Sequence, residues 1–174
     1  FDQGIAHIGG WSAAEGTTLK VPRYTTEQIA ADDVKVVDTA STVNSYEALT
    51  NGGVKYYERR AQISAESGAP VIYQPGIALK ADAYTLNFDM YSAAATTVQA
   101  AIYSVDSEGK LGTKLLESPV VNYTDVNAIK NYTWTFTTPR ALGNAALALT
   151  FGDGAVVQID NVTMLGKGQA EVLD

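Results

Sequence analysis

The chain has 174 residues, of which 46% are hydrophobic and 18% are charged, with a formal net charge of −7 and no cysteine. This length suits one domain with a single core, and the acidic balance leaves no basic surface for a nucleic-acid backbone. No apolar run approaches the about eighteen residues that a membrane-spanning helix needs, so membrane insertion is not expected. The absence of cysteine excludes disulfide and thiolate chemistry.

The first third of the chain has the least regular pattern. Thr25 can cap a short helix, because Gln28 three residues later completes a capping box and residues 27–31 form the turn. The region 12–53 is otherwise rich in Thr, Ala, Asp and Ser, and no topology follows from its sequence. Strands are predicted here at residues 34–38 and 54–63.

From residue 71 onward, apolar and polar residues alternate with a period of two in segments bounded by Gly, Pro, Asn or Asp. The clearest segment contains Tyr132, Trp134 and Phe136, which alternate with threonines. The predicted strands of this part are residues 71–74, 83–91, 97–105, 131–139, 144–151 and 155–164. Many short strands with turns between them predict an all-β fold, a two-sheet antiparallel β-sandwich with at most one or two short helices.

Three short motifs occur in order along nearly the whole chain. They are Phe1-Asp2-Gln3-Gly4 with Gly10-Trp11, then Tyr84-Thr85-Leu86-Asn87-Phe88-Asp89, and finally Ile159-Asp160-Asn161-Val162. In these motifs the chain resembles the carbohydrate-binding modules of the family 4, 9 and 22 group. The resemblance implies a jelly-roll sandwich, secreted or at the cell surface, that binds a polysaccharide or oligosaccharide along one sheet and is covalently linked to a glycoside hydrolase.

The resemblance also indicates which side chains would meet the sugar. A sugar ring has apolar C–H faces and a rim of hydroxyls, so its binder needs flat aromatic rings and fixed hydrogen-bonding groups. The family's polar positions fall on Gln74 and Gln99, and strand alternation puts Tyr103 on the same face as Gln99 as a stacking platform. Tyr57 and Arg59 are further candidates, because they share one face of their predicted strand. The alternative for Arg59 is a plain surface ion pair.

Other positions depart from the family pattern. Ala14 and Leu111 fall where the family has stacking aromatics, and Ala146 and Thr150 fall where it has glutamines. Cellulose-type specificity is therefore not expected. Two alternatives stay open: the groove has moved toward the tyrosines of the first third of the chain, or Gln99 and Tyr103 belong to an ordinary solvated surface and sugar binding is lost.

A structural calcium ion is the second site that the resemblance implies. Its ligands would be the Asp160 carboxylate, the Gly53 carbonyl and Asp2, and such a site would hold distant segments of the sandwich together. The alternative is that Asp160 only accepts backbone hydrogen bonds.

Catalysis is not expected from this sequence. Glycoside hydrolysis needs two facing carboxylates about 5 to 10 Å apart, and no spacing pairs the two strand acids Asp89 and Glu58. His7 is the only histidine and has no metal-binding motif around it. We therefore expect a single non-catalytic domain at residues 1–165 followed by a polar tail at 166–174, excised or processed from a larger protein. The alternative function is a structural or adhesive spacer without sugar binding.

Overall fold

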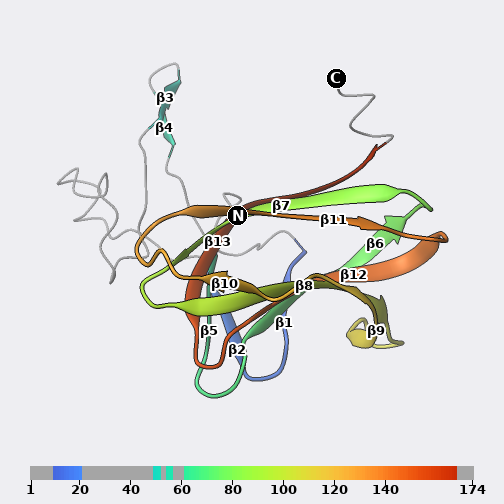
Figure 1. The fold of residues 1–174 in the computed structure, drawn as a ribbon, viewed down its shortest axis with the longest axis horizontal. Helices are drawn as coiled ribbons and strands as arrows, with labels where there is room; N and C mark the ends of the chain where they lie inside the picture. Colours follow the sequence, from blue (N-terminus) through green and yellow to red (C-terminus); the bar gives the residue numbers. More distant parts are fainter. Residues whose placement is uncertain (1–9, 21–48, 52–53, 57–60, 168–174) are drawn as a thin grey trace.

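The computed structural model describes residues 10–20, 49–51, 54–56 and 61–167. Within these ranges the chain forms two antiparallel β-sheets that pack face to face (Figure 1), so the predicted all-β sandwich is confirmed. The described residues contain no helix that could cross a membrane. The predicted helix near Thr25 and the predicted strand at 34–38 lie outside the described residues.

Sheet A has the strand order β1-β6-β12-β8-β10, and β9 also pairs with β8. Its strands are β1 (Ser12–Ala13), β6 (Val71–Leu79), β8 (Thr96–Val105), β9 (Leu111–Glu117), β10 (Val121–Tyr123) and β12 (Leu142–Phe151). Sheet B has the order β11-β7-β13-β5-β2. Its strands are β2 (Thr17–Lys20), β5 (Ala61–Ala65), β7 (Ala83–Ser92), β11 (Lys130–Thr137) and β13 (Val156–Gly166). The short strands β3 (Leu49–Asn51) and β4 (Val54–Tyr56) pair with each other.

The main core lies between the two sheets and follows the predicted alternation. Tyr84, Leu86, Phe88 and Met90 of β7 are buried there, and Val98, Ala100 and Ile102 of β8 belong to the same cluster. Aromatic rings of β11 extend this core, with the Trp134 and Phe136 centroids 4.4 Å apart. Each fully buried side chain of this size contributes about 1.5 to 3 kcal/mol. Trp11, Tyr84, Tyr132 and Trp134 therefore serve packing, as predicted.

The structure differs from the predicted strands at the sheet edges and at one bulge. Strands β9 and β10 were not predicted, because β9 is largely exposed and β10 has only three residues, which leaves no apolar alternation to detect. Strand β6 continues past Gln74 to Leu79, although Pro75 and Gly76 interrupt its pattern. Gly76 has a φ of 77°, and the register between β6 and β12 shifts in this stretch. A glycine in a left-handed conformation is what such a bulge requires.

Tyr123 of β10 fixes the loop between β10 and β11. The side chain is buried, and its hydroxyl lies within hydrogen-bonding distance of the backbone oxygens of Ser92 and Ala128. The backbone N–H of Asn127 also donates to the Ser92 oxygen at 2.9 Å. One tyrosine thus ties the end of β7 to the loop that leads into β11.

Candidate carbohydrate-binding face

The outer face of sheet A is built from residues that the strand register places side by side. Tyr73, Ala148 and Ala101 lie opposite one another on β6, β12 and β8. Ala146 of β12 lies opposite Tyr103 of β8. Opposite residues in an antiparallel sheet point to the same side. We call this surface, with Ala101, Ala146 and Ala148 at its centre, the alanine face.

The alanine face carries a second, smaller apolar cluster. Tyr73, Ala146 and Ala148 are buried in it, and Tyr103 and Leu111 pack against it while remaining partly accessible. Because alanine side chains are short, there is room for the neighbouring tyrosine side chains to pack over them. The face therefore has aromatic and apolar material at its surface, although it points away from the main core.

Gln99 supplies a fixed polar group on the same face. It lies opposite Thr150 of β12, which in turn lies opposite Val71 of β6. The Gln99 Nε2 atom donates a hydrogen bond to the backbone oxygen of Ser118 at 2.8 Å. A primary amide has two donor hydrogens and a carbonyl acceptor, so one bond orients the side chain and leaves further hydrogen-bonding capacity for a ligand.

The ammonium group of Lys114 lies beside the Tyr103 ring. The Lys114 Nζ atom lies 5.9 Å from the centre of the Tyr103 ring and 3.0 Å from the Glu117 Oε2 atom. The hydrogen bond to Glu117 and the charge interactions with Tyr103 and Glu117 raise the pKa of Lys114 above its usual value of 10.5. Lys114 therefore remains an ammonium group at neutral pH. Since this ion pair is exposed, it contributes little to the free energy of unfolding.

The structure brings together two of the five predicted sugar-contacting residues. Gln99 and Tyr103 share the alanine face and are both half-buried. Gln74 does not join them, because it lies opposite Leu147, whose side chain belongs to the main core. Its amide instead lies near Gly10, where an added Cβ would stand 3.6 Å from Nε2. Tyr57 and Arg59 lie outside the described residues.

Sequence reasoning missed Tyr73 and Lys114 as members of this face, and it named Thr150 only as a position where the family has a glutamine. Tyr73 could have been found, because alternation from the buried Ile72 places its neighbour on the opposite side of β6. The family pattern pointed one residue further along, to Gln74. Lys114 gave no signal of its own, since it lies on an exposed strand without alternation.

Asp160, the proposed calcium ligand, lies on sheet B. It is only 3% exposed and lies opposite Asp89 of β7. Asp89 accepts hydrogen bonds from the Nδ2 atoms of Asn131 and Asn161, both at 2.9 Å. Like charges directly opposite each other destabilise a sheet, and a hard cation with oxygen ligands would relieve this repulsion. The described residues place no cluster of metal-binding side chains around Asp160, and Gly53 and Asp2 lie outside them, so the calcium site stays a prediction.

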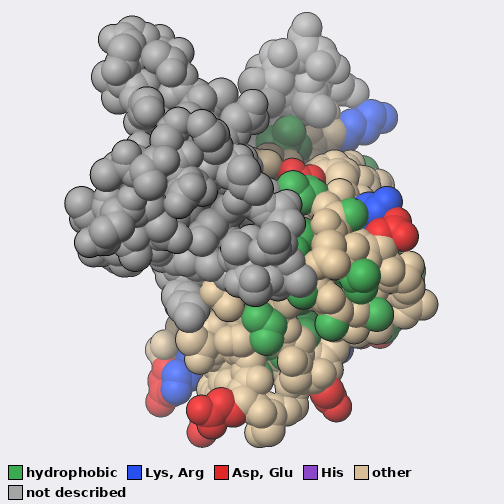
Figure 2. All heavy atoms as spheres, turned by 90° about the vertical axis from the view of Figure 1, so that its left-hand side faces the viewer, with side chains coloured by type: hydrophobic (Ala, Val, Ile, Leu, Met, Phe, Trp, Pro, Cys, Tyr) green, Lys and Arg blue, Asp and Glu red, His purple; other side chains and the backbone are tan. Residues whose placement is uncertain are grey.

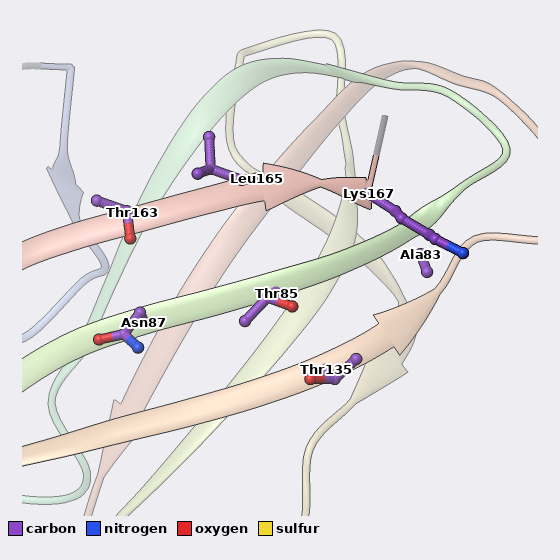
Figure 3. Close-up of a pocket in the computed structure, with 7 residues that line it drawn as sticks. All are labelled: Ala83, Thr85, Asn87, Thr135, Thr163, Leu165 and Lys167. Atoms are coloured by element: carbon purple, nitrogen blue, oxygen red, sulfur yellow. The ribbon is translucent and has the colours of Figure 1, made fainter. Parts of the chain in front are cut away.

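The outer face of sheet B, which we call the threonine face, has a different surface. It contains an open hollow of about 480 Å³ whose lining side chains stand on β7, β11 and β13 and just after β13 (Figure 3). The lining residues are Ala83, Thr85, Asn87, Thr135, Thr163, Leu165 and Lys167. The threonine, asparagine and lysine side chains among them can form hydrogen bonds, but none of the lining residues is aromatic. The hollow thus lacks the stacking platform that the alanine face has in Tyr103.

The acidic side chains of the described residues are dispersed over the sandwich. These residues contain no group of three or more His, Cys, Asp or Glu side chains that could hold a metal ion. Asp89, the strand acid considered for glycoside hydrolysis, is bound to two asparagine amides. Glu58, the other strand acid named from the sequence, lies outside the part of the chain that the structure describes.

No protein family and no curated protein matches the chain by sequence. Solved structures do match its fold. One is a CBM4 carbohydrate-binding module, 17% identical, with a TM-score of 0.51 over 62% of this chain and 84% of that one. Another is the CBM22-1 xylan-binding domain of Paenibacillus barcinonensis Xyn10C, 12% identical, with a TM-score of 0.56 over 94% and 88% of the two chains.

A third match is a Clostridium thermocellum xylanase 10B structure that joins CBM22-1 and GH10 modules and contains xylohexaose. It is 16% identical, with a TM-score of 0.57 over 91% of this chain but only 26% of that longer chain. The chain therefore has the fold of carbohydrate-binding modules. The resemblance predicted from the three sequence motifs is confirmed at the level of the fold.

Proposed function

We propose that this chain is a non-catalytic module that binds a polysaccharide on its alanine face. The observation that carries the proposal is the placement of the half-buried side chains of Gln99 and Tyr103 on one face of sheet A, with the Gln99 amide already oriented by Ser118. The shared fold with carbohydrate-binding modules supports it. In this proposal a sugar ring stacks on Tyr103, while Gln99 and Thr150 bind its hydroxyls.

Xylan is the glycan that we propose first. The xylan-binding domain is similar to this chain over nearly the full length of both. Ala14 and Leu111, which fall where the family has stacking aromatics, pack against the apolar cluster of the alanine face. The surface therefore has fewer aromatic platforms than the family pattern has. We expect weaker stacking than in family members with those aromatics, and a contact with only a short stretch of the glycan.

Affinity electrophoresis of the whole chain tests this function. Native gels would contain xylan, a mixed-linkage β-glucan or galactan, with a non-binding protein of similar size and acidity as the mobility control. Retarded migration in xylan, with release of no reducing sugar, is the expected result. Unchanged migration in every glycan would contradict the proposal and favour the structural or adhesive spacer. Release of reducing sugar would contradict the non-catalytic assignment.

We also propose a structural calcium ion at Asp160. The buried carboxylate opposite Asp89 supports a cation there. A ligand that binds only the folded state at about 100 times its Kd adds about 2.7 kcal/mol to the free energy of unfolding. We therefore expect calcium to raise the Tm and a chelator to lower it, with no such response in Asp160→Asn. An identical Tm with calcium and with chelator would contradict this proposal without affecting the glycan proposal.

Secretion and covalent linkage to a glycoside hydrolase belong to the same proposal. The xylanase structure that carries a module of this fold beside a GH10 module supports the linkage. In such an arrangement the binding module holds the enzyme near its insoluble substrate, which raises the local substrate concentration.

A further inference from the structure

Strand β11 is an unusual edge in the described sandwich. It pairs with β7 over eight residues, from Lys130 to Thr137, without a register shift, proline or glycine. The other described edges are short or irregular, with two residues in β1, three in β10 and four in β2, and register shifts along β9. Short length and irregular register are ordinary protections against strand addition. Strand β11 lacks both.

The hydrogen-bond pattern shows which backbone groups of β11 face the open edge. Just beyond the strand, the Thr138 N–H donates to the Asp82 oxygen at 2.9 Å, so this pair is a hydrogen-bonded one. Such pairs alternate along an antiparallel ladder. The backbone groups of Tyr132 and Trp134 therefore turn toward β7, and those of Thr133 and Thr135 turn away from it. No described strand pairs with β11 on that side.

An apolar cleft lies beside this edge, between β11 of sheet B and the β8–β10 edge of sheet A. Its volume is about 140 Å³, close to the about 150 Å³ of a cavity that holds benzene. Its apolar lining includes Phe88, Val98, Pro119, Val121, Tyr132 and Trp134. Tyr132 and Trp134 remain partly accessible although their side chains point inward. The core is thus incompletely covered along β11.

Exposed apolar residues continue from this cleft. Val120 and Val121 are 58% and 37% exposed, and Val126 and Ile129 of the β10–β11 loop are 42% and 53% exposed. Figure 2 shows several hydrophobic side chains at the surface on the side of the molecule where this loop lies. The loop is held by Tyr123, so its apolar residues sit on a fixed support beside the edge.

We propose that the β11 edge binds an extended segment of another polypeptide, which adds to sheet B as a further strand. The backbone groups of Thr133 and Thr135 would form the ladder, and one leucine-sized side chain of the segment would fill the cleft. This combination of main-chain hydrogen bonds with a side-chain pocket is the physical basis of strand addition. The proposal goes beyond glycan binding, which is assigned to the other sheet.

A second copy of this chain fits the edge less well. The inward side chains of its own β11 are already packed in its own core, so they could not enter the cleft. Two copies would also bring together two chains with a net charge of −7 each. The occupant is therefore a segment whose alternate side chains are free, with aliphatic residues on the side that faces the cleft.

A synthetic peptide, acetyl-Lys-Thr-Leu-Thr-Leu-Thr-Lys-amide, serves as the probe in a titration followed by backbone amide NMR of the whole chain. We expect saturable shifts at Thr133 and Thr135 and slower hydrogen exchange of their amides. Thr135→Pro, which removes one outward N–H, should weaken binding about tenfold, whereas Thr135→Val should leave it within about twofold. The same peptide N-methylated on its threonines, whose N–H groups would face β11 when the leucines face the cleft, should not bind.

Three results would overturn the inference. They are the absence of saturation up to about 1 mM peptide, equal affinity for the peptide and its N-methylated form, and protection of the same amides by self-association without peptide. The N-methylated peptide keeps the test decisive even if Thr135→Pro does not fold. Retardation of Thr135→Val in xylan gels should match that of the unmodified chain, so failure of glycan binding and failure of strand addition are separate outcomes.

Discussion

The outer face of sheet A carries alanines flanked by tyrosines, whereas the outer face of sheet B carries threonines and asparagines. Both faces arise from the same alternation of side chains along their strands. Ala146 and Ala148 are fully buried in a small apolar cluster, while Thr133 and Thr135 are exposed to solvent. The alanine face is a second packed layer, and the threonine face is a hydrated surface.

Under the proposed function, the comparison separates the polarity of a face from its suitability for a sugar ring. The threonine face has a hollow of about 480 Å³ lined by several hydroxyl groups. Exposed polar groups of this kind bond to neighbours, as Asn87 does to Thr133, or are hydrated in solution. A sugar would have to displace that water without gaining an aromatic contact. The alanine face offers fewer hydrogen bonds, but it combines Tyr103 with an oriented amide.

Ala148→Leu is expected to give the largest effect. The added side chain has no space in the packed alanine face, so the free energy of unfolding should fall by about 1 to 3 kcal/mol. Thr85→Leu places the same side chain on the exposed threonine face and should change it by no more than about 0.5 kcal/mol. Urea denaturation measures both. Equal losses in the two variants would contradict the difference in packing between the faces.

Tyr103→Ala should have the largest effect on binding alone. Loss of the ring removes the stacking platform, and we expect about tenfold weaker binding, or about 1.4 kcal/mol. Tyr103→Phe keeps the ring and should bind within about threefold of the unmodified chain. Affinity electrophoresis over a range of xylan concentrations gives the ratio. Unchanged retardation of Tyr103→Ala would show that the binding site does not lie on the alanine face.

Gln99→Ala should weaken binding by about 0.5 to 1.5 kcal/mol, the usual net value of a hydrogen bond. Gln74→Ala is its matched control, because Gln74 lies opposite Leu147 and away from this face. The same gels measure both variants. An equal or larger loss in Gln74→Ala would show that the ligand reaches around the β1–β6 edge of the sheet.

Thr163→Val should give the smallest effect. It removes one hydroxyl from the hollow of the threonine face and keeps the shape and β-propensity of the side chain. We expect the free energy of unfolding to stay within about 0.5 kcal/mol and the retardation in xylan to stay unchanged. Reduced retardation would show that the threonine face binds glycan too. It would contradict the proposal that only the alanine face binds glycan.

Alternation in the sequence was sufficient to predict the strands that are buried on one side. Strands β7, β8 and β11 follow it closely, because the core imposes apolar side chains at every second position. It could not find β9, whose side chains mostly meet solvent, or β10, which is too short to show a period. Nor could it find the pairing of Tyr103 with Lys114, since that contact depends on which strand lies beside β8.

The two residues that share the alanine face were predicted on different grounds. The family pattern selected Gln99, and alternation along the same regular strand added Tyr103 four residues later. The family pattern and alternation diverge on strand β6. They disagree at Gln74, where the family pattern selects a residue one position past Tyr73. Strand β6 bends at the bulge around Gly76 just after this point, so a pattern transferred by sequence can slip by one residue and select the wrong face.

Tyr123 has a consequence for how the molecule opens. Its hydroxyl bridges the end of β7 and the loop before β11, and the Asn127 amide is bonded to the same Ser92 oxygen. These segments cannot separate from one another without breaking the bridge, so they form one cooperative unfolding unit. The hydrogen-exchange rate of the Asn127 amide therefore reports on the opening of the whole corner that supports β10 and the start of β11.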